Sequence, residues 1–168
     1  MTHERERSDL LETLARHRQF LRFTTRDLTD EQAAQRTTVS ALTLGGLIKH
    51  VAGVEMGWAA FATGGREKMF AAISSHGGTW EDTFRMLPGE TLASLLDRYA
   101  AVADQTTAIV NSVPDLDVDY ELPEAPWNEP GARWSIHRVL MHMIAETSQH
   151  AGHADIIREA LDGQKTMG

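Results

Sequence analysis

The sequence of 168 residues contains no cysteine. This absence excludes a disulfide scaffold, a metal site built from thiolates and a cysteine nucleophile. If the protein carries out thiol chemistry, the reacting thiol must therefore come from a small molecule.

A cluster of basic residues is also missing. The chain holds 16 lysines and arginines against 24 aspartates and glutamates, which gives a formal net charge of −8. Proteins that bind nucleic acids usually present a basic face to the phosphates. The arginines here are scattered and neighboured by acids, as in the segment Glu4–Arg7. We therefore expect no nucleic-acid partner.

Long hydrophobic runs are absent as well. Lys49, His50 or Glu55 interrupts the longest apolar stretches, so we expect no membrane span, and the first residues lack the apolar run of a signal peptide. A chain of this length with 42% hydrophobic and 24% charged residues is typical of one globular domain. The expectation is a single cytoplasmic domain over residues 1–168.

Apolar residues recur at helical spacing in four long segments. They predict helices from about Arg5 to Asp27, Thr43 to Thr63, about Glu90 to Ser112, and Trp134 to about Leu161. Thr29–Gln32 has the form of a capping box and predicts a short helical turn. Since no convincing strand lies between the helices, the predicted fold class is all-α, a four-helix bundle with long connecting loops.

Two predicted connections are longer than an up-and-down bundle requires. Residues 64–89 contain turn chemistry at Ser74–Gly78, and residues 113–133 contain four prolines, so both segments are expected to be loops. Trp127 and Trp134 bracket the loop that enters the last helix, where they either line a pocket or, as we favour, anchor the loop. Extra loop length of this kind often covers a site.

Glu146 is the clearest anomaly in the last predicted helix. On a helical projection it lies about 40° from His150, close to the middle of an apolar stripe. A carboxylate there is unfavourable unless it is paired or bound to a metal. Because the two residues are four apart, one helical face can offer both to a single ion.

His50 gives an independent signal in the second predicted helix, where it borders the apolar stripe. Gly46, Gly53 and Gly57 flank it on the other side. Each glycine costs roughly 1 kcal/mol of helix stability relative to alanine. Either another helix packs very closely there, or the missing side chains leave room for a ligand beside His50.

His50, Glu146 and His150 together form a candidate three-ligand site for a divalent metal. Zinc is favoured by these nitrogen and oxygen donors, and iron, nickel and manganese remain open. The alternative is a buried Glu146–His150 hydrogen-bonded pair without metal. His142 and His153 lie further round the same side of the predicted helix. Each is a fourth ligand, a hydrogen-bond donor to a ligand or a general base, unless it is simply a polar residue at the edge of the stripe.

Two segments also carry a family resemblance. They are residues 140–159 (LMHMIAETSQHAGHADIIRE) and residues 43–58 (TLGGLIKHVAGVEMGW). They resemble the last and second helices of the DinB-like superfamily. The resemblance is closest to its actinobacterial mycothiol-dependent transferase and maleylpyruvate isomerase-like branch. It extends to residues 28–32 and 160–163, and it is loose across residues 64–133.

This resemblance implies a four-helix bundle with a divalent metal, commonly zinc or nickel, held at the positions of His50, Glu146 and His150. Many members have histidine where this chain has Glu146, and the mycothiol-dependent maleylpyruvate isomerases have glutamate. The resemblance also implies mycothiol or bacillithiol as a thiol cosubstrate in S-transfer or isomerisation.

The first functional hypothesis is a metal-dependent transferase that activates a mycothiol-like thiol for S-transfer to an electrophilic small molecule, in detoxification or a stress response. A metal lowers the pKa of a coordinated thiol, so that a thiolate exists at neutral pH. From their positions, His153 is expected to accept the thiol proton as a catalytic residue. Asp155 and Arg158 are expected to bind polar groups of the cosubstrate.

Two alternatives stay open. A metal-dependent isomerase or hydrolase would use the same three ligands to polarise a carbonyl or activate water. A non-catalytic metal-binding stress protein would have its site closed by a fourth ligand such as His153, because catalysis needs an open position. Exposed helix faces could in addition support a homodimer.

Overall fold

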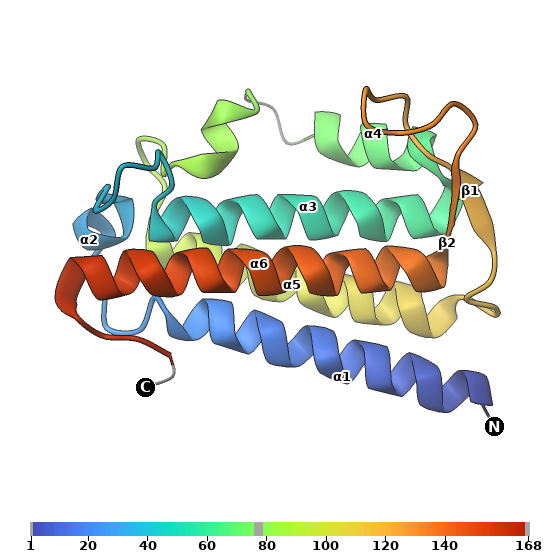
Figure 1. The fold of residues 1–168 in the computed structure, drawn as a ribbon, viewed down its shortest axis with the longest axis horizontal. Coiled ribbons are helices and arrows are strands. Elements are labelled where there is room, and N and C mark those ends of the chain that lie inside the picture. The colour runs from blue at the N-terminus through green and yellow to red at the C-terminus, as the bar shows by residue number, and fades with distance from the viewer. Residues whose placement is uncertain (1, 76–78, 167–168) are drawn as a thin grey trace.

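Four long helices lie side by side in the computed structural model, which describes residues 2–75 and 79–166 (Figure 1). They are α1 (Thr2–Phe23), α3 (Leu44–Gly64), α5 (Leu92–Ser112) and α6 (Ile136–Asp162). Helix α6 packs against α1 and α3, and helix α5 packs against the same two. The predicted all-α bundle is confirmed.

Local sequence sets the ends of these helices. The hydroxyls of Thr43 and Ser135 accept hydrogen bonds from the backbone N–H groups of Gly46 and Arg138, which caps the start of α3 and of α6. Gly163 follows α6 with a φ of 78°, a left-handed conformation that glycine adopts easily. The expected boundaries of both helices therefore hold to within about a residue or two.

Helix α1 ends at Phe23, earlier than the expected Asp27. Thr24 and Thr25 donate their hydroxyl protons to carbonyls three residues back, and Asp27 adopts a φ of 58°. These local contacts turn the chain before it enters the short helix α2 (Asp30–Ala34), whose capping box was predicted.

The connection between α3 and α5 is not the loop that the sequence predicts. It contains α4 (Arg66–Ser74) and the 3-10 helix η1 (Glu81–Phe84), which lie along the outer side of α3. Figure 1 shows α3 and α5 running in the same direction, so the chain must return along the bundle between them. The expected turn at 74–78 falls partly on residues 76–78, which lie outside the described residues.

A small hairpin also corrects the prediction for residues 113–133. Strand β1 (Asp119–Glu121) pairs antiparallel with β2 (Arg133–Ser135), and Tyr120 lies opposite Trp134. The prolines fall outside both strands, at positions where they remove no hydrogen-bond donor from the pair.

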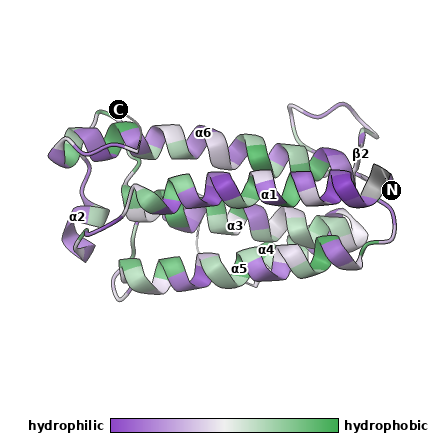
Figure 2. Cartoon of the chain, turned by 90° about the horizontal axis from the view of Figure 1, so that it is seen from below, coloured by the Kyte–Doolittle hydropathy of each residue, from purple (hydrophilic) through white to green (hydrophobic). Residues whose placement is uncertain are grey.

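Two clusters of buried hydrophobic side chains fill the bundle. One includes Leu14, Phe61 and Met143, and the other includes Leu21, Leu47 and Ile157. Hydrophilic and hydrophobic residues are mixed along every long helix (Figure 2). Accordingly, none of the helices in the described part of the chain is long and apolar enough to cross a membrane.

A buried polar layer separates these two clusters. Arg18 on α1, Glu55 on α3, Thr106 on α5 and Thr147 on α6 are all buried at positions between the clusters. The Arg18 guanidinium donates to both carboxylate oxygens of Glu55, at 3.0 and 2.5 Å. The charges of Arg18 and Glu55 are thus matched inside the bundle, where an unpaired ion would be strongly unfavourable.

Candidate metal centre

His50, Glu146 and His150 meet where α3 packs against α6. One ligand atom from each residue lies within 4.8 Å of the other two, and no other such group of three occurs among residues 4–75 and 79–166. His50 is 4% exposed, whereas the side chains of His150 and Glu146 are 13% and 29% exposed. The cluster is therefore buried on the α3 side and reaches solvent at Glu146.

The geometry of this cluster fits a divalent cation. Nε2 of His150 lies 3.5 Å from Oε2 of Glu146. In a tetrahedral zinc site with bonds of about 2.0–2.1 Å, neighbouring ligand atoms are roughly 3.4 Å apart. Two imidazole nitrogens and one carboxylate oxygen also match the donor set of catalytic zinc sites, which keep a position for water or substrate.

The charge states of the cluster suit a cation as well. Burial, reinforced by the neighbouring His150, lowers the pKa of His50 to about 4. The hydrogen bond from His150 lowers the pKa of Glu146 against the opposing effect of burial. At neutral pH the site therefore offers a neutral imidazole and an ionised carboxylate, the forms that bind metals.

Residues from η1 and its N-terminal flank surround the His50 ring. Phe84 stacks on it, with 4.2 Å between the ring centroids. Trp80 packs edge-on against His50, with 5.3 Å between the centroids. Thr83 Oγ1 lies 3.3 Å from Nδ1 of His50. The sequence prediction missed these contacts, although two aromatic residues four apart in a segment expected to be irregular were a usable signal.

Close packing, one of the two explanations left open by the sequence, accounts for one of the three α3 glycines beside His50. A Cβ on Gly46 would lie 1.9 Å from the carbonyl oxygen of Phe84, so close packing explains this glycine. The packing partner is the η1 segment and not another long helix. A Cβ on Gly57 would make ordinary contact with Ile73, and one on Gly53 would meet nothing within 4 Å.

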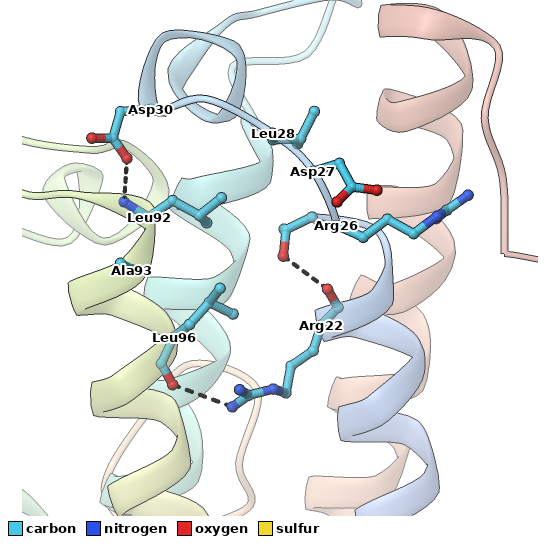
Figure 3. A pocket seen from close by; sticks show the side chains of 9 residues that line it. Arg22, Arg26, Asp27, Leu28, Asp30, Leu92, Ala93 and Leu96 are labelled. Carbon is cyan, nitrogen blue, oxygen red and sulfur yellow. Dashed lines mark hydrogen bonds between the residues drawn. The ribbon is translucent and has the colours of Figure 1, made fainter.

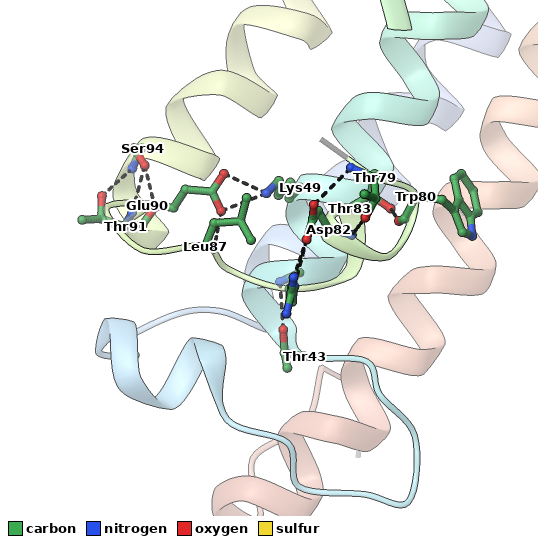
Figure 4. A network of polar contacts seen from close by, with 12 residues as sticks. Thr43, Lys49, Thr79, Trp80, Asp82, Thr83, Leu87, Glu90, Thr91 and Ser94 are labelled. Atoms are coloured by element: carbon green, nitrogen blue, oxygen red, sulfur yellow. Dashed lines mark hydrogen bonds and ion pairs between the residues drawn. The ribbon is translucent and has the colours of Figure 1, made fainter. Parts of the chain in front are cut away.

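A network of polar contacts holds the η1 segment against α3 (Figure 4). Lys49 on α3 forms an ion pair with Glu90 at 2.8 Å, and Glu90 also accepts a hydrogen bond from the backbone N–H of Leu87. Asp82 accepts from the backbone N–H of Thr79 and from the Arg85 guanidinium. These contacts fix the backbone on both sides of Thr83.

His142 lies against the other carboxylate oxygen of Glu146. Its Nε2 is 3.9 Å from Oε1, and its ring packs edge-on against Trp58 and Trp134. Burial lowers the pKa of His142, against the opposing effect of Glu146. Trp134 also stacks on Trp58 at 5.1 Å, which anchors the incoming loop, while Trp127 is 84% exposed and anchors nothing.

His153 packs behind His150 and is not one of the three clustered residues. The Nδ1 atoms of the two rings are 3.4 Å apart. Because Nε2 of His150 points to Glu146, the second nitrogen of this ligand faces His153. His153 is therefore placed to hold the orientation of His150.

Asp155 and Arg158 do not join the cluster. The Arg158 side chain is 1% exposed and donates to the carbonyls of Thr24 and Arg26 and to Asp162, so it ties the end of α1 to α6. Asp155 lies about 180° around the helix from Glu146 and accepts from the backbone N–H of Thr166. These structural contacts take the place of the cosubstrate contacts that we expected.

A separate hollow of about 390 Å³ lies between the C-terminal end of α1 and the N-terminal end of α5 (Figure 3). Arg22 and Leu28 line it, and Asp30 accepts a hydrogen bond from the backbone N–H of Leu92 at its rim. None of the site residues predicted from the sequence lines this hollow. It is not part of the metal centre.

A comparison with protein families found a match. A family model described as mycothiol-S-transferase matches residues 9–163 of the chain, a range that includes all three clustered residues. No curated protein and no solved structure showed a significant match.

Proposed function

The chain belongs to the mycothiol-S-transferase family, and we propose that it transfers a low-molecular-weight thiol to an electrophilic small molecule with the help of a divalent metal. Family membership supports a metal-dependent enzyme with a thiol cosubstrate. The observation that carries the proposal for this chain is the convergence of His50, Glu146 and His150 within 4.8 Å. A role in detoxification or stress would follow from the chemistry of the electrophile.

In this proposal His50 and His150 hold the cation through ring nitrogens, and Glu146 holds it through a carboxylate oxygen. A bound divalent cation would lower the pKa of a coordinated thiol enough to supply a thiolate near neutral pH. Zinc suits the donor set best, and nickel fits it too. Since the chain has no cysteine, the reacting sulfur must arrive with the cosubstrate.

His153 is proposed to accept the proton of the thiol. Its ring packs behind His150, with the two Nδ1 atoms 3.4 Å apart. The ring is partly exposed and can exchange that proton with solvent. His142 is proposed to orient Glu146 through the contact with Oε1.

A thiol-dependent isomerase is the second candidate, and Glu146 is the residue that favours it. The maleylpyruvate isomerase-like branch that this chain resembles has glutamate at this position. Both candidates use the same ligands, and they differ in whether the sulfur stays on the product.

The test combines metal analysis with a conjugation assay. We expect about one equivalent of zinc or nickel in untagged wild-type protein, and metal-dependent conjugation of mycothiol to monochlorobimane. His150→Ala should lose both, whereas His137→Ala, on the same helix but paired with Glu6, should keep both. Failure of the fully metallated protein to turn over any small thiol would reject the transferase. Turnover of a substrate without added thiol would indicate a hydrolase instead.

A further inference from the structure

The hydroxyl of Thr83 lies between the His50 ring and the backbone oxygen of Trp80. Its Oγ1 lies 3.3 Å from Nδ1 of the imidazole and 2.7 Å from the backbone oxygen of Trp80. A threonine hydroxyl carries one proton, and a carbonyl oxygen can only accept. The Thr83 hydroxyl therefore donates to the carbonyl oxygen of Trp80, and Oγ1 is left to accept a hydrogen bond from Nδ1 of His50.

This arrangement selects one tautomer of His50. A neutral imidazole carries a single proton, on either Nδ1 or Nε2, and the other nitrogen keeps the lone pair that binds a metal. When Nδ1 donates to Thr83, the lone pair is on Nε2. We propose that Thr83 is a positioning residue that holds the proton of His50 on Nδ1 and directs Nε2 toward the metal. The inference rests on the metal site of the proposed function.

Neighbouring residues hold Thr83 in place beside His50. Because Gly46 has no side chain, the carbonyl of Phe84 can approach α3 very closely. This approach brings the neighbouring Thr83 beside His50. Phe84 then stacks on the His50 ring and restricts its rotation. The hydrogen bonds of Asp82 fix the preceding backbone.

The second histidine of the cluster also has a partner at Nδ1. Nδ1 of His150 faces His153, and its Nε2 faces Glu146. With a metal on Nε2 of His150, its Nδ1 proton would point to His153, so Thr83 would support the α3 histidine as His153 would support the α6 histidine. In metal sites, outer partners of this kind set the tautomer and ring orientation, and their loss typically weakens metal binding 10- to 100-fold.

The test compares Thr83→Val, which keeps the shape but has no hydroxyl, with Thr83→Ser, which keeps the hydroxyl. Long-range proton–nitrogen correlation spectra of histidine-labelled protein report which ring nitrogen is protonated, and His50→Ala identifies the His50 signals. We expect protonated Nδ1 in the wild type and in Thr83→Ser, with and without zinc. In metal-free Thr83→Val we expect a population with protonated Nε2. Competition with a chromophoric chelator should show zinc affinity about 10- to 100-fold weaker in Thr83→Val and within about threefold of wild type in Thr83→Ser.

Three results would overturn the inference. They are protonated Nε2 in metal-free wild type, an unchanged tautomer in Thr83→Val, and equal zinc affinity in Thr83→Val and wild type. A fall in melting temperature without a change of tautomer also counts against it, because that is the signature of a merely structural contact. If the wild type binds no metal, the proposed function fails, and the metal-free spectra still decide whether Thr83 sets the tautomer.

Discussion

Two polar regions occupy the middle of the bundle, and they differ in how their carboxylates are satisfied. Glu55 is 1% exposed and takes two hydrogen bonds from the guanidinium of Arg18. Glu146 is 29% exposed and lies beside the imidazoles of His142 and His150. The first region is closed and fully paired, and the second is open and partly paired.

The difference lies in the partners. A guanidinium is always charged and fits a carboxylate through two parallel hydrogen bonds, so the Arg18–Glu55 pair has no need of a cation. An imidazole carries no permanent charge to compensate the carboxylate of Glu146, and in its neutral form it has a lone pair of its own. The groups that face each carboxylate thus separate the structural role of Glu55 from the metal-binding role proposed for Glu146.

The largest effect should come from breaking the closed pair. Glu55→Ala leaves the Arg18 guanidinium buried without its partner, and we expect a loss of about 3–5 kcal/mol in unfolding free energy. For a chain of this length that is a fall of roughly 6–20 °C in melting temperature. Thermal denaturation of the metal-free protein measures it. The double variant Arg18→Met/Glu55→Leu should recover most of the loss, and no recovery would mean that the pair does more than satisfy charge.

Breaking the open cluster should separate metal binding from stability. Glu146→Gln removes the anionic ligand, and we expect zinc affinity to fall at least about 100-fold, or roughly 2.7 kcal/mol. The unfolding free energy of the metal-free protein should change by less than about 1 kcal/mol, because the side chain is partly exposed. Chelator competition and denaturant titration measure the two quantities. A large loss of stability with zinc affinity retained would reverse the roles assigned to the two regions.

Acid should act on the open cluster through His50. Its pKa is about 4 in the folded protein and about 6.5 when unfolded, so the unfolded chain binds more protons between these values. The metal-free protein should therefore lose stability as the pH falls from 6.5 through 4, by about 3 kcal/mol in all, and His50 should add little further loss once the pH is well below 4. Denaturant titrations at several pH values measure this loss. His50→Gln should flatten the slope in that window, and an unchanged slope would assign it to other groups.

Two glycines of α3 test how the open cluster is supported. Gly46→Ala would force the Phe84 carbonyl away from α3, and we expect a loss of about 1–3 kcal/mol together with weaker zinc binding. Gly53→Ala meets nothing within 4 Å, and we expect a gain of roughly 0.5–1 kcal/mol with zinc binding unchanged. Denaturant titration and chelator competition on this matched pair give the answer. Equal unfolding free energies and equal zinc affinities of the two variants would mean that close packing of η1 against α3 does not support the cluster.

Much of the bundle could be predicted from hydrophobic spacing and capping residues. The four long helices were expected within a few residues, and the family match confirms the DinB-like resemblance. Residues 64–133 were predicted least well. Helix α4, η1 and the β1–β2 hairpin are short, and short elements form because the bundle offers a surface for them, not because of their own periodicity.

The candidate site divides in the same way. His50, Glu146 and His150 could be picked out because polar residues on an apolar face are costly without a partner. The sequence did not single out Glu55 as a site residue, and in the structure its contact with Arg18 sets it apart from Glu146. Asp155 and Arg158 were expected to bind the cosubstrate because of their positions along α6. Their positions around the helix instead place their side chains in contacts outside the cluster.

By itself, then, the sequence determined the helices, the faces they bury and the ligand types on those faces, because these depend on local spacing. The tertiary structure decided which carboxylate meets an arginine and which meets histidines. It also decided that Thr83 and Phe84 reach His50. The physical reason is that partners far apart in the chain are chosen by helix packing and crossover paths, which no local pattern records.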